Sequence, residues 1–309
     1  TSSLGKLPTI LSLLVMRHRD WSRTFLFTEL LWLLIFILNF NNCGLVEGSP
    51  GGQPSGQPSA EPIWCPIVID EEGRGTFNAS DIKAIGTTMF TKDCKDTDLD
   101  NMVSISIPSS VEIIESLAFS SSLSRLPALK TVDLSDATSL TLIGSRAFFT
   151  MTITEVNFES ATSLRQIGMQ AFYMSQLTDA TFPPSLTHLN DSAFSKCKSL
   201  KRVDMSLTKV ESIRYSCFKF SSQLSDVKLP SKVKYIGEDA FMRCRLTSIA
   251  FPNTTLSILI SSFRDNDFKE VVFPASMTNI GGDAFAANAY LAKVEFLGTP
   301  AVDAYTFRL

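Results

Sequence analysis

Residues 231–244 read SKVKYIGEDAFMRC, and the pattern of this stretch returns through most of the chain. A small residue followed by phenylalanine stands in the same local frame nine times. After a first interval of 29 residues, consecutive phenylalanines lie 22 to 24 residues apart. A unit of this size cannot bury its apolar face alone, so the repetition predicts stacked structural units rather than a single site. We expect the nine phenylalanines to form the structural core: Phe119, Phe148, Phe172, Phe194, Phe218, Phe241, Phe263, Phe285 and Phe307.

Each repeat begins with a strand pattern. In the repeat quoted above, Val227 and Leu229 alternate with Asp226 and Lys228, which is the period of a strand with one buried face. Proline follows the strand in five repeats, where ladder donors are no longer needed. These prolines are Pro108, Pro183, Pro230, Pro252 and Pro274. The pattern predicts that the chain turns at this point.

The second part of the repeat is expected to return as a short helical or irregular segment. Val233, Ile236 and the pair Ala240–Phe241 follow at spacings of three and four residues, which puts their apolar side chains on one face. Gly237 is expected to turn the chain. The fold class predicted is therefore an α/β solenoid of about nine repeats of 22–24 residues, wound as a right-handed coil around a parallel sheet.

The pattern Leu-x-x-Val-x-Leu/Phe-Pro, Ile-Gly and Ala-Phe, repeated in register, resembles the leucine-rich repeats of the BspA-like group. These occur in surface proteins of bacteria and of several unicellular eukaryotes. The resemblance covers about residues 102–307, and two repeats extend it with AFSKCKSL and AFMRCRL. One repeat, TTLSILISSF, departs from it by lacking the glycine. The resemblance implies a curved solenoid that acts in adhesion or protein recognition; it implies no enzymatic reaction and no cofactor.

The N-terminal region has the pattern of a membrane-targeting segment. A basic stretch, RHRDWSR at residues 17–23, precedes the apolar stretch FLFTELLWLLIFILNF, Phe25 to Phe40. As a helix this stretch covers about 24 Å, short of the ~30 Å hydrocarbon core. It therefore fits either a cleaved signal peptide or a signal anchor that is a transmembrane helix. Positive charge before it predicts a cytoplasmic N-terminus and an exported body in both cases. A buried helix of a soluble protein is the third reading.

Four segments follow from these patterns. Residues 1–44 are the targeting or membrane segment, and residues 45–62, with Gly-Gln-Pro-Ser repeated, are an extended stalk. Residues 63–101 form an N-terminal cap that holds a degenerate repeat, IGTTMF. Residues 102–309 form the leucine-rich repeat domain. Its last repeat reads as incomplete and its C-terminal cap as absent.

The outward side chains of the strands are the expected binding face of such a solenoid. Read column by column they alternate in charge and contain no aromatic residue, which favours a polar recognition face; an ordinary solvated sheet is the alternative. The charged members are Asp133, Glu155, Asp179, Arg202, Asp204, Asp226, Lys228, Glu270, Lys293 and Glu295. Lys and Arg number 28 against 31 Asp and Glu, a net charge of -3, so no nucleic-acid partner is expected.

The cysteines divide into two groups. Cys197 and Cys244 occupy the same frame two repeats apart, about 10 Å in a stack of strands spaced ~4.8 Å, too far for a disulfide. They and Cys217 are therefore expected to fill buried space. Cys65 and Cys94 lie in the predicted cap, where export permits a disulfide between them. Asn78, Asn190 and Asn253 begin Asn-x-Ser/Thr sequences and are candidate glycosylation sites.

No catalytic or metal site can be assembled from the residues. The chain has only two histidines and no Ser/His/Asp or Cys/His pattern. Asp96, Asp98 and Asp100 have the first spacing of a calcium loop, but Asn101 and Ile107 stand where Gly and Glu are required. We therefore expect neither an enzyme nor a bound metal.

The sequence predicts a cell-surface, membrane-anchored recognition or adhesion protein with its C-terminal domain outside the cell; secretion is the alternative. Its partner is expected to be a protein or a surface glycan, and its membrane contact runs through Phe25 to Phe40. Two other functions stay open. One is an intracellular leucine-rich repeat scaffold, and the other is the sensing region of a larger signalling enzyme.

Overall fold

The computed structural model describes residues 67–77, 81–90, 99–120 and 126–308, which belong to one compact unit of the chain, residues 60–309. The apolar stretch at residues 25–40, the helix predicted there and the stalk lie outside the described residues. Within the described ranges, no helix has the length and apolar character needed to cross a bilayer.

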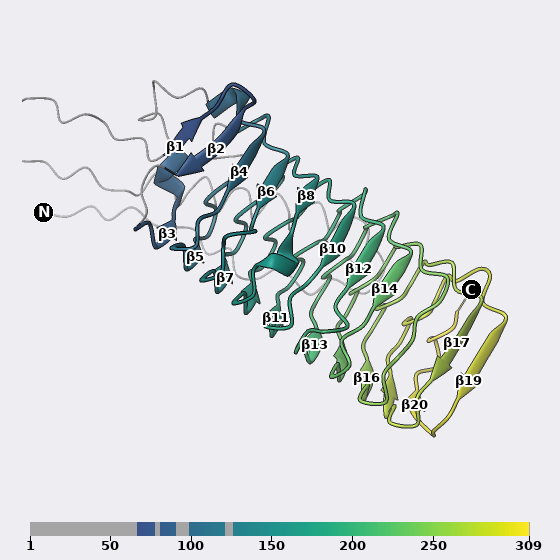
Figure 1. Ribbon diagram of the computed structural model, residues 1–309. Helices are drawn as coiled ribbons and strands as arrows, with labels where there is room; N and C mark the ends of the chain where they lie inside the picture. Colours follow the sequence, from purple (N-terminus) through teal and green to yellow (C-terminus); the bar gives the residue numbers. More distant parts are fainter. Residues whose placement is uncertain (1–66, 78–80, 91–98, 121–125, 309) are drawn as a thin grey trace, which may run out of the picture. The chain divides into compact units, whose positions relative to one another are not determined.

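Successive repeats lay their strands side by side in two walls, which we call the first and the second wall (Figure 1). The first wall holds β1 (Ile67–Ile69), β2 (Arg74–Phe77), β4 (Ser104–Ser106), β6 (Thr131–Asp133), β8 (Glu155–Val156), β10 (Asp179–Thr181), β12 (Arg202–Asp204), β14 (Asp226–Lys228), β17 (Glu270–Phe273) and β19 (Lys293–Phe296). The second wall holds β3 (Ala84–Ile85), β5 (Ile113–Ile114), β7 (Leu142–Ile143), β9 (Gln166–Ile167), β11 (His188–Leu189), β13 (Ser212–Ile213), β15 (Tyr235–Ile236), β16 (Ser257–Ile258), β18 (Asn279–Ile280) and β20 (Ala301–Val302).

Strand pairing between repeats is parallel, as the sequence predicts. In the first wall Arg202 pairs with Asp179 on one side and with Asp226 on the other. In the second wall Tyr235 pairs with Ser257 in the same way. A residue therefore faces its equivalent in the next repeat, and each equivalent position becomes a column along the stack.

The predicted helical return is wrong for the described residues. These contain no α-helix; their helical turns are η1 (Thr87–Phe90), η2 (Leu99–Asn101) and η3 (Phe158–Ser160), all of the 3-10 type. The spacing of three and four that suggested a helix is produced instead by a two-residue strand of the second wall followed by a turn. The fold is thus a β-solenoid, and the α part of the predicted α/β class does not occur in this region.

Hydrogen bonds between repeats explain why no helix forms. Around Phe241, the backbone N–H groups of Asp239, Phe241 and Arg243 donate to carbonyls of the following repeat, at 2.7 to 3.1 Å. The two N–H groups between them, of Ala240 and Met242, close local turns. Alternate donors are therefore taken by the neighbour, which is incompatible with the continuous i to i−4 bonds of an α-helix.

Left-handed residues make this turn, and they are not glycines. Asp239 and Arg243 have φ of 57° and 56°, and the equivalent pairs recur two residues before and two residues after most of the repeat phenylalanines. Gly237 has a different role from the one predicted, because its φ is not left-handed. A Cβ there would lie 2.7 Å from the carbonyl oxygen of Ile213 in the preceding repeat, so the glycine permits close stacking.

The chain turns at each of the five prolines predicted to follow a strand; four of them follow a first-wall strand, whereas the strand predicted before Pro252 is not formed. In every case the proline carbonyl accepts a hydrogen bond from the N–H three residues later, at 3.0 to 3.1 Å. The acceptors are Pro108, Pro183, Pro230, Pro252 and Pro274. Proline lacks an N–H to donate and fixes its φ near the value that a turn needs, so it ends the strand and starts the return at once.

One ring from each repeat stacks on the next through the interior, and we call this column the Phe ladder. It joins the nine predicted phenylalanines and Phe90 of the degenerate repeat, with neighbouring ring centroids 4.6 to 5.9 Å apart. From Phe90 to Phe285 the rings are buried. Ring pairs at these distances add a specific stabilisation to their burial.

A second interior column lies three residues after the Phe ladder. Its side chains donate to the backbone carbonyl of the preceding repeat's phenylalanine: Cys197 at 3.1 Å, Ser221 at 2.9 Å, Cys244 at 3.3 Å, Asn266 at 2.8 Å and Asn288 at 3.0 Å. We call these five the carbonyl-capping column. The cysteines in it are buried, and they fill space and also satisfy a carbonyl that would otherwise lack a partner.

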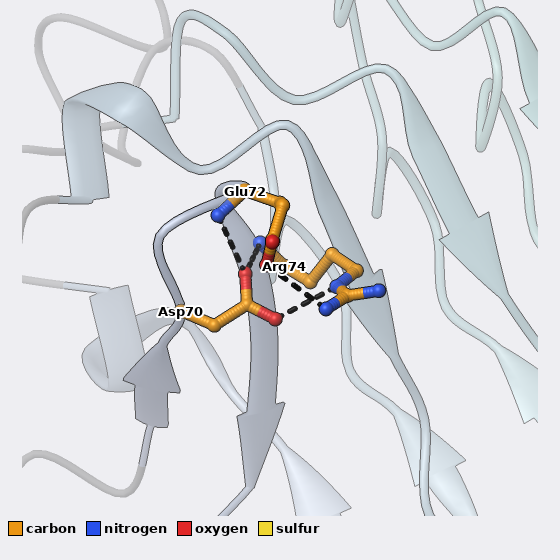
Figure 2. Close-up of polar contacts among 3 residues, drawn as sticks. All are labelled: Asp70, Glu72 and Arg74. Carbon is orange, nitrogen blue, oxygen red and sulfur yellow. Dashed lines mark hydrogen bonds and ion pairs between the residues drawn. The ribbon is translucent and has the colours of Figure 1, made fainter.

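An antiparallel hairpin ends the first wall at its N-terminal edge. β1 and β2 pair antiparallel, and β2 then pairs in parallel with β4. Figure 2 shows how the hairpin turn is held: the carboxylate of Asp70 accepts from the backbone N–H of Glu72 and of Arg74, and also from Arg74 Nε. These bonds, chiefly the one from the Arg74 backbone, hold the pKa of Asp70 below its usual range.

Candidate recognition surface

The predicted binding face is brought together on the first wall. Parallel register aligns Asp179, Arg202 and Asp226 in one column, and Glu270 with Lys293 further along it. Ser248 of the repeat between them lies in a segment without strand structure, so the column is interrupted there. The ten predicted charged residues thus lie on one wall, but on three separate sheets.

Most of these charges are paired with one another. Arg202 Nε lies 2.6 Å from Asp179 Oδ1, and Lys228 Nζ lies 2.8 Å from Asp204 Oδ2. Lys293 Nζ lies 3.7 Å from Glu270 Oε2 and 3.4 Å from Glu295 Oε2. Exposed pairs of this kind contribute about 0 to 1 kcal/mol each. The ten residues are seven carboxylates and three basic groups, so the face is a largely paired polar surface that keeps an excess of negative charge.

Two aspartates of this wall are held by a local Asp-x-Ser turn. Asp133 Oδ1 accepts from the hydroxyl of Ser135 at 2.6 Å and from its backbone N–H at 2.9 Å, and the Ser135 hydroxyl is the main reason that the pKa of Asp133 is lowered. Asp204 is bound in the same way by Ser206. Burial alone would raise the pKa of Asp204, but bonds from Lys228 and Ser206 outweigh it, and the pKa is lowered. Both carboxylates are thus already occupied.

Exposed aromatic and aliphatic side chains lie on the second-wall side of several repeats, outside the predicted binding face. Tyr215 and Tyr235 are each 46% exposed, Leu259 41%, Ile260 54% and Tyr305 63%. Tyr235 is on β15, and the others lie between a second-wall strand and the Phe ladder. Part of this surface could be found in the sequence, because Tyr215 and Ile260 share the column three residues before a ladder phenylalanine, but the prediction considered only the first-wall columns as a surface.

A hollow of ≈490 Å³ lies at the C-terminal part of this side, and we call it the notch. It is lined by Ile260, Gly281, Gly282, Asp283, Asp303, Tyr305 and Arg308. Asp283 Oδ2 lies 3.1 Å from Arg308 Nη2 and 3.4 Å from Arg264 Nη1. Asp303 Oδ1 accepts the backbone N–H of Tyr305 at 3.1 Å. The notch therefore combines carboxylate, guanidinium and aromatic groups on a glycine floor.

The described cysteines have no features of a reactive site. Cys197, Cys217 and Cys244 are buried free thiols. Burial raises the pKa of Cys197 to about 12 and raises the pKa of Cys217 and of Cys244 well above the usual value. Cys65 and Cys94, the predicted disulfide, lie outside the described residues. No group of three or more His, Cys, Asp or Glu side chains in the described part of the chain is arranged to hold a metal ion.

Two of the three glycosylation candidates can be placed. Asn253 is exposed in the turn that begins at Pro252. Asn190 follows β11 and is half-buried, at the position that Gly237 occupies in its own repeat. Asn78 lies outside the described residues. An attached glycan needs an exposed amide, so Asn253 is the better placed of the two.

Solved structures that are similar to the chain include the following three. A leucine-rich repeat protein from Bacteroides ovatus is 19% identical, with 77% of this chain and 69% of that protein covered and a TM-score of 0.41. The pneumococcal vaccine antigen PcpA is 20% identical over 74% and 67%, with a TM-score of 0.47. The leucine-rich repeat protein of T. pallidum is 21% identical over 58% and 85%, with a TM-score of 0.45. No curated protein matches the chain.

The repeats themselves define the class of protein. The interior Phe ladder, the parallel walls and the period of 22 to 24 residues are those of a leucine-rich repeat solenoid. Residues 83–219 and 205–308 match the family model of the BspA type leucine rich repeat region, with six copies. These ranges make up more than half of the chain, so it belongs to the BspA-type leucine-rich repeat family, as the residue pattern predicted.

Proposed function

We propose that this chain is a non-enzymatic recognition protein whose leucine-rich repeat domain binds a protein or a surface glycan. The observation that carries the proposal is the difference between interior and outward positions within each repeat. Interior positions repeat the same residue types, whereas the outward columns differ from repeat to repeat on a continuous scaffold. Function on such a scaffold depends on its surface residues.

The predicted location adds to this proposal. A basic stretch followed by the apolar residues 25–40, and then a Gly/Pro-rich stalk at residues 45–62, supports an exported domain that is tethered to a membrane or secreted. In this arrangement the Cys65–Cys94 disulfide would close the cap at residues 63–101, and Asn253 would carry a glycan. The exported domain would then contact neighbouring cells or matrix through its outward columns.

The first wall is proposed as a protein-binding face. Asp226 and Glu155 are exposed there and form no ion pair with the described residues, so they are free to pair with a partner's Lys or Arg. Arg202 is already bound to Asp179 and would have to exchange that partner. Charges of this kind contribute more to the association rate and to specificity than to affinity.

Surface display tests the proposal directly. The full chain with a C-terminal epitope tag is expressed in cells, and antibody binding is compared between intact and permeabilised cells. We expect staining of intact cells or recovery of the tagged protein from the medium. Staining that requires permeabilisation, together with unmodified Asn253 by mass spectrometry, would contradict export and favour an intracellular scaffold.

A further inference from the structure

The notch exists because the column three residues before each phenylalanine lacks a side chain at one repeat. Equivalent positions carry Ser145, Met169, Tyr215 and Ile260, and the repeat before Phe285 carries Gly282. Gly281 precedes it, so two consecutive residues leave the surface bare between the exposed side chains of Ile260 and Tyr305. The fold accepts large residues at this position, so it does not require glycine there.

The polar groups around the notch offer both donors and acceptors. Arg308 Nη2 is bound to Asp283, but the side chain is 53% exposed and guanidinium has further N–H groups. Asp303 makes no ion pair with the described residues, and a Cβ at Gly282 would lie 3.3 Å from its carboxylate, which therefore stands directly over the glycine floor. Asp283 Oδ1 is buried and has no hydrogen-bond partner among the described residues.

The charges of the notch nearly cancel. Among the lining residues, Asp283 and Asp303 carry carboxylates and Arg308 carries a guanidinium; Arg264, outside the lining, also pairs with Asp283 and brings the local charge to balance. A free anion would be repelled by the carboxylates. A Lys or Arg from a partner protein, although attracted by Asp303 and by the ring of Tyr305, would be repelled by Arg308 in the lining and by Arg264, which binds the same oxygen of Asp283. The balance favours an uncharged ligand that uses donors and acceptors together.

A sugar ring has the matching properties. Its hydroxyl groups can donate to a carboxylate and accept from a guanidinium, and its C–H face can pack on the exposed ring of Tyr305. Apolar walls with a few placed polar groups are the usual composition of a small-ligand site. We propose that the notch binds one ring of a neutral saccharide. This inference rests on the recognition function proposed above and narrows it to a ligand class.

The first experiment uses the full chain in a detergent with a sugar-free zwitterionic headgroup. It is applied to an array of immobilised neutral oligosaccharides built from glucose, galactose, mannose, fucose and N-acetylhexosamines, with sulfated and sialylated glycans and oligolysine beside them. We expect binding to at least one neutral oligosaccharide, with a Kd on the order of 0.1 to 1 mM for the free sugar. Because the ligand is uncharged, binding should not change between about 0.05 M and about 0.5 M NaCl.

A matched pair of variants places the binding at the notch. Gly282→Tyr fills the hollow with a side chain that the same position carries at Tyr215, and Ser145→Tyr adds the same side chain to the same column far from the notch. We expect the first to weaken saccharide binding at least about tenfold and the second to leave it unchanged. Urea unfolding of both variants checks that each is folded.

Three results would overturn the inference. They are binding to no neutral glycan on the array, equal saccharide binding by Gly282→Tyr and the unaltered chain, and salt-sensitive binding of oligolysine in place of sugar. In each case surface display of the chain could still be observed, and the recognition function would stand without a saccharide site at the notch. Loss of surface display with retained saccharide binding would contradict the proposed location and leave the saccharide site at the notch in place.

Discussion

The interior and the exterior of each turn use side chains in opposite ways. Inside, the Phe ladder places a ring at the same position in every repeat, with ring centroids 4.6 to 5.9 Å apart, and the carbonyl-capping column places a Cys, Ser or Asn side chain at one position in five repeats. Outside, the first wall holds exposed ion pairs that differ between repeats, and the second-wall side holds scattered tyrosines and the notch. The interior contacts therefore supply most of the stability, and the residue types in the outward columns can differ from repeat to repeat.

The largest effect should follow removal of one ring from the Phe ladder. Phe241 is buried and contacts Phe218 and Phe263 at 5.2 and 5.3 Å. We expect Phe241→Ala to lower the free energy of unfolding by about 3 to 5 kcal/mol, measured by urea denaturation, and to alter ligand binding only through folding. A variant with full stability and no binding would show that this ring belongs to a site.

The next effect tests the carbonyl-capping column. Asn266 accepts from the N–H of Leu246 and donates to the carbonyls of Phe241 and Phe263, all in a buried setting. Asn266→Ala leaves these groups without partners and should cost about 1 to 3 kcal/mol in urea unfolding. Asn279→Ala, an exposed asparagine one repeat on, is the control and should be nearly neutral. Equal effects would contradict the division between interior and exterior.

Two glycines allow a comparison between a position where neighbouring repeats stack closely and a position on the surface. A Cβ at Gly237 would lie within 3.0 Å of three backbone atoms of the preceding repeat, whereas at Gly282 its nearest neighbours are side-chain atoms of Asp303 at 3.3 Å. Gly237→Ala should therefore destabilise by about 1 to 3 kcal/mol, because backbone must move. Gly282→Ala should change the melting temperature little, since only one flexible side chain must shift.

The smallest mutational effect is expected on the first wall. Arg202→Ala removes an exposed ion pair with Asp179, so stability should fall by about 0 to 1 kcal/mol and the difference should vanish in about 1 M NaCl. Chemical denaturation with urea at low and high salt measures it. A loss as large as that of Phe241→Ala would mean that the outer wall contributes to stability as the interior does.

Acid should lower the free energy of unfolding through two aspartates of the first wall. Hydrogen bonds hold the pKa values of Asp133 and Asp204 below the usual range. Their contribution is therefore complete above the unfolded-state pKa, near 4 for a free Asp, and is lost as the pH falls through the lower folded-state pKa. Urea midpoints should drop below about pH 4. The double variant Asp133→Asn with Asp204→Asn should show a flatter pH profile.

Much of the fold could be predicted from the spacing of its residues. The period, the strand before four of the five prolines, the parallel register and the Phe ladder follow from alternation at Val227 and Leu229 and from the recurring Ala-Phe pair. The helical return could not be excluded, because Val233, Ile236 and Ala240 have the same spacing in a helix and in a short strand followed by a turn. Only the bonds to the next repeat decide between them.

The surface was less predictable than the interior. The first-wall columns were read correctly as neighbours, but their mutual ion pairing depends on side-chain geometry between repeats. The notch was missed because it arises from absent side chains at Gly281 and Gly282, and no single residue type marks a hollow. Likewise, the sequence does not indicate that the Cys244 thiol donates a hydrogen bond to the carbonyl of Phe218.

The one-repeat reach of nearly every interior contact has a consequence for the length of the protein. Among the rings of the described residues, Phe241 stacks only on the one before it and the one after it, and the capping side chains reach back by a single repeat. Excision of one whole unit between two phenylalanines would therefore bring equivalent surfaces together and leave the interior continuous. The notch would move about 4.8 Å toward the N-terminal hairpin for each unit removed. The length of the solenoid, and with it the position of the notch, can thus change by whole repeats without any change in the interior residues.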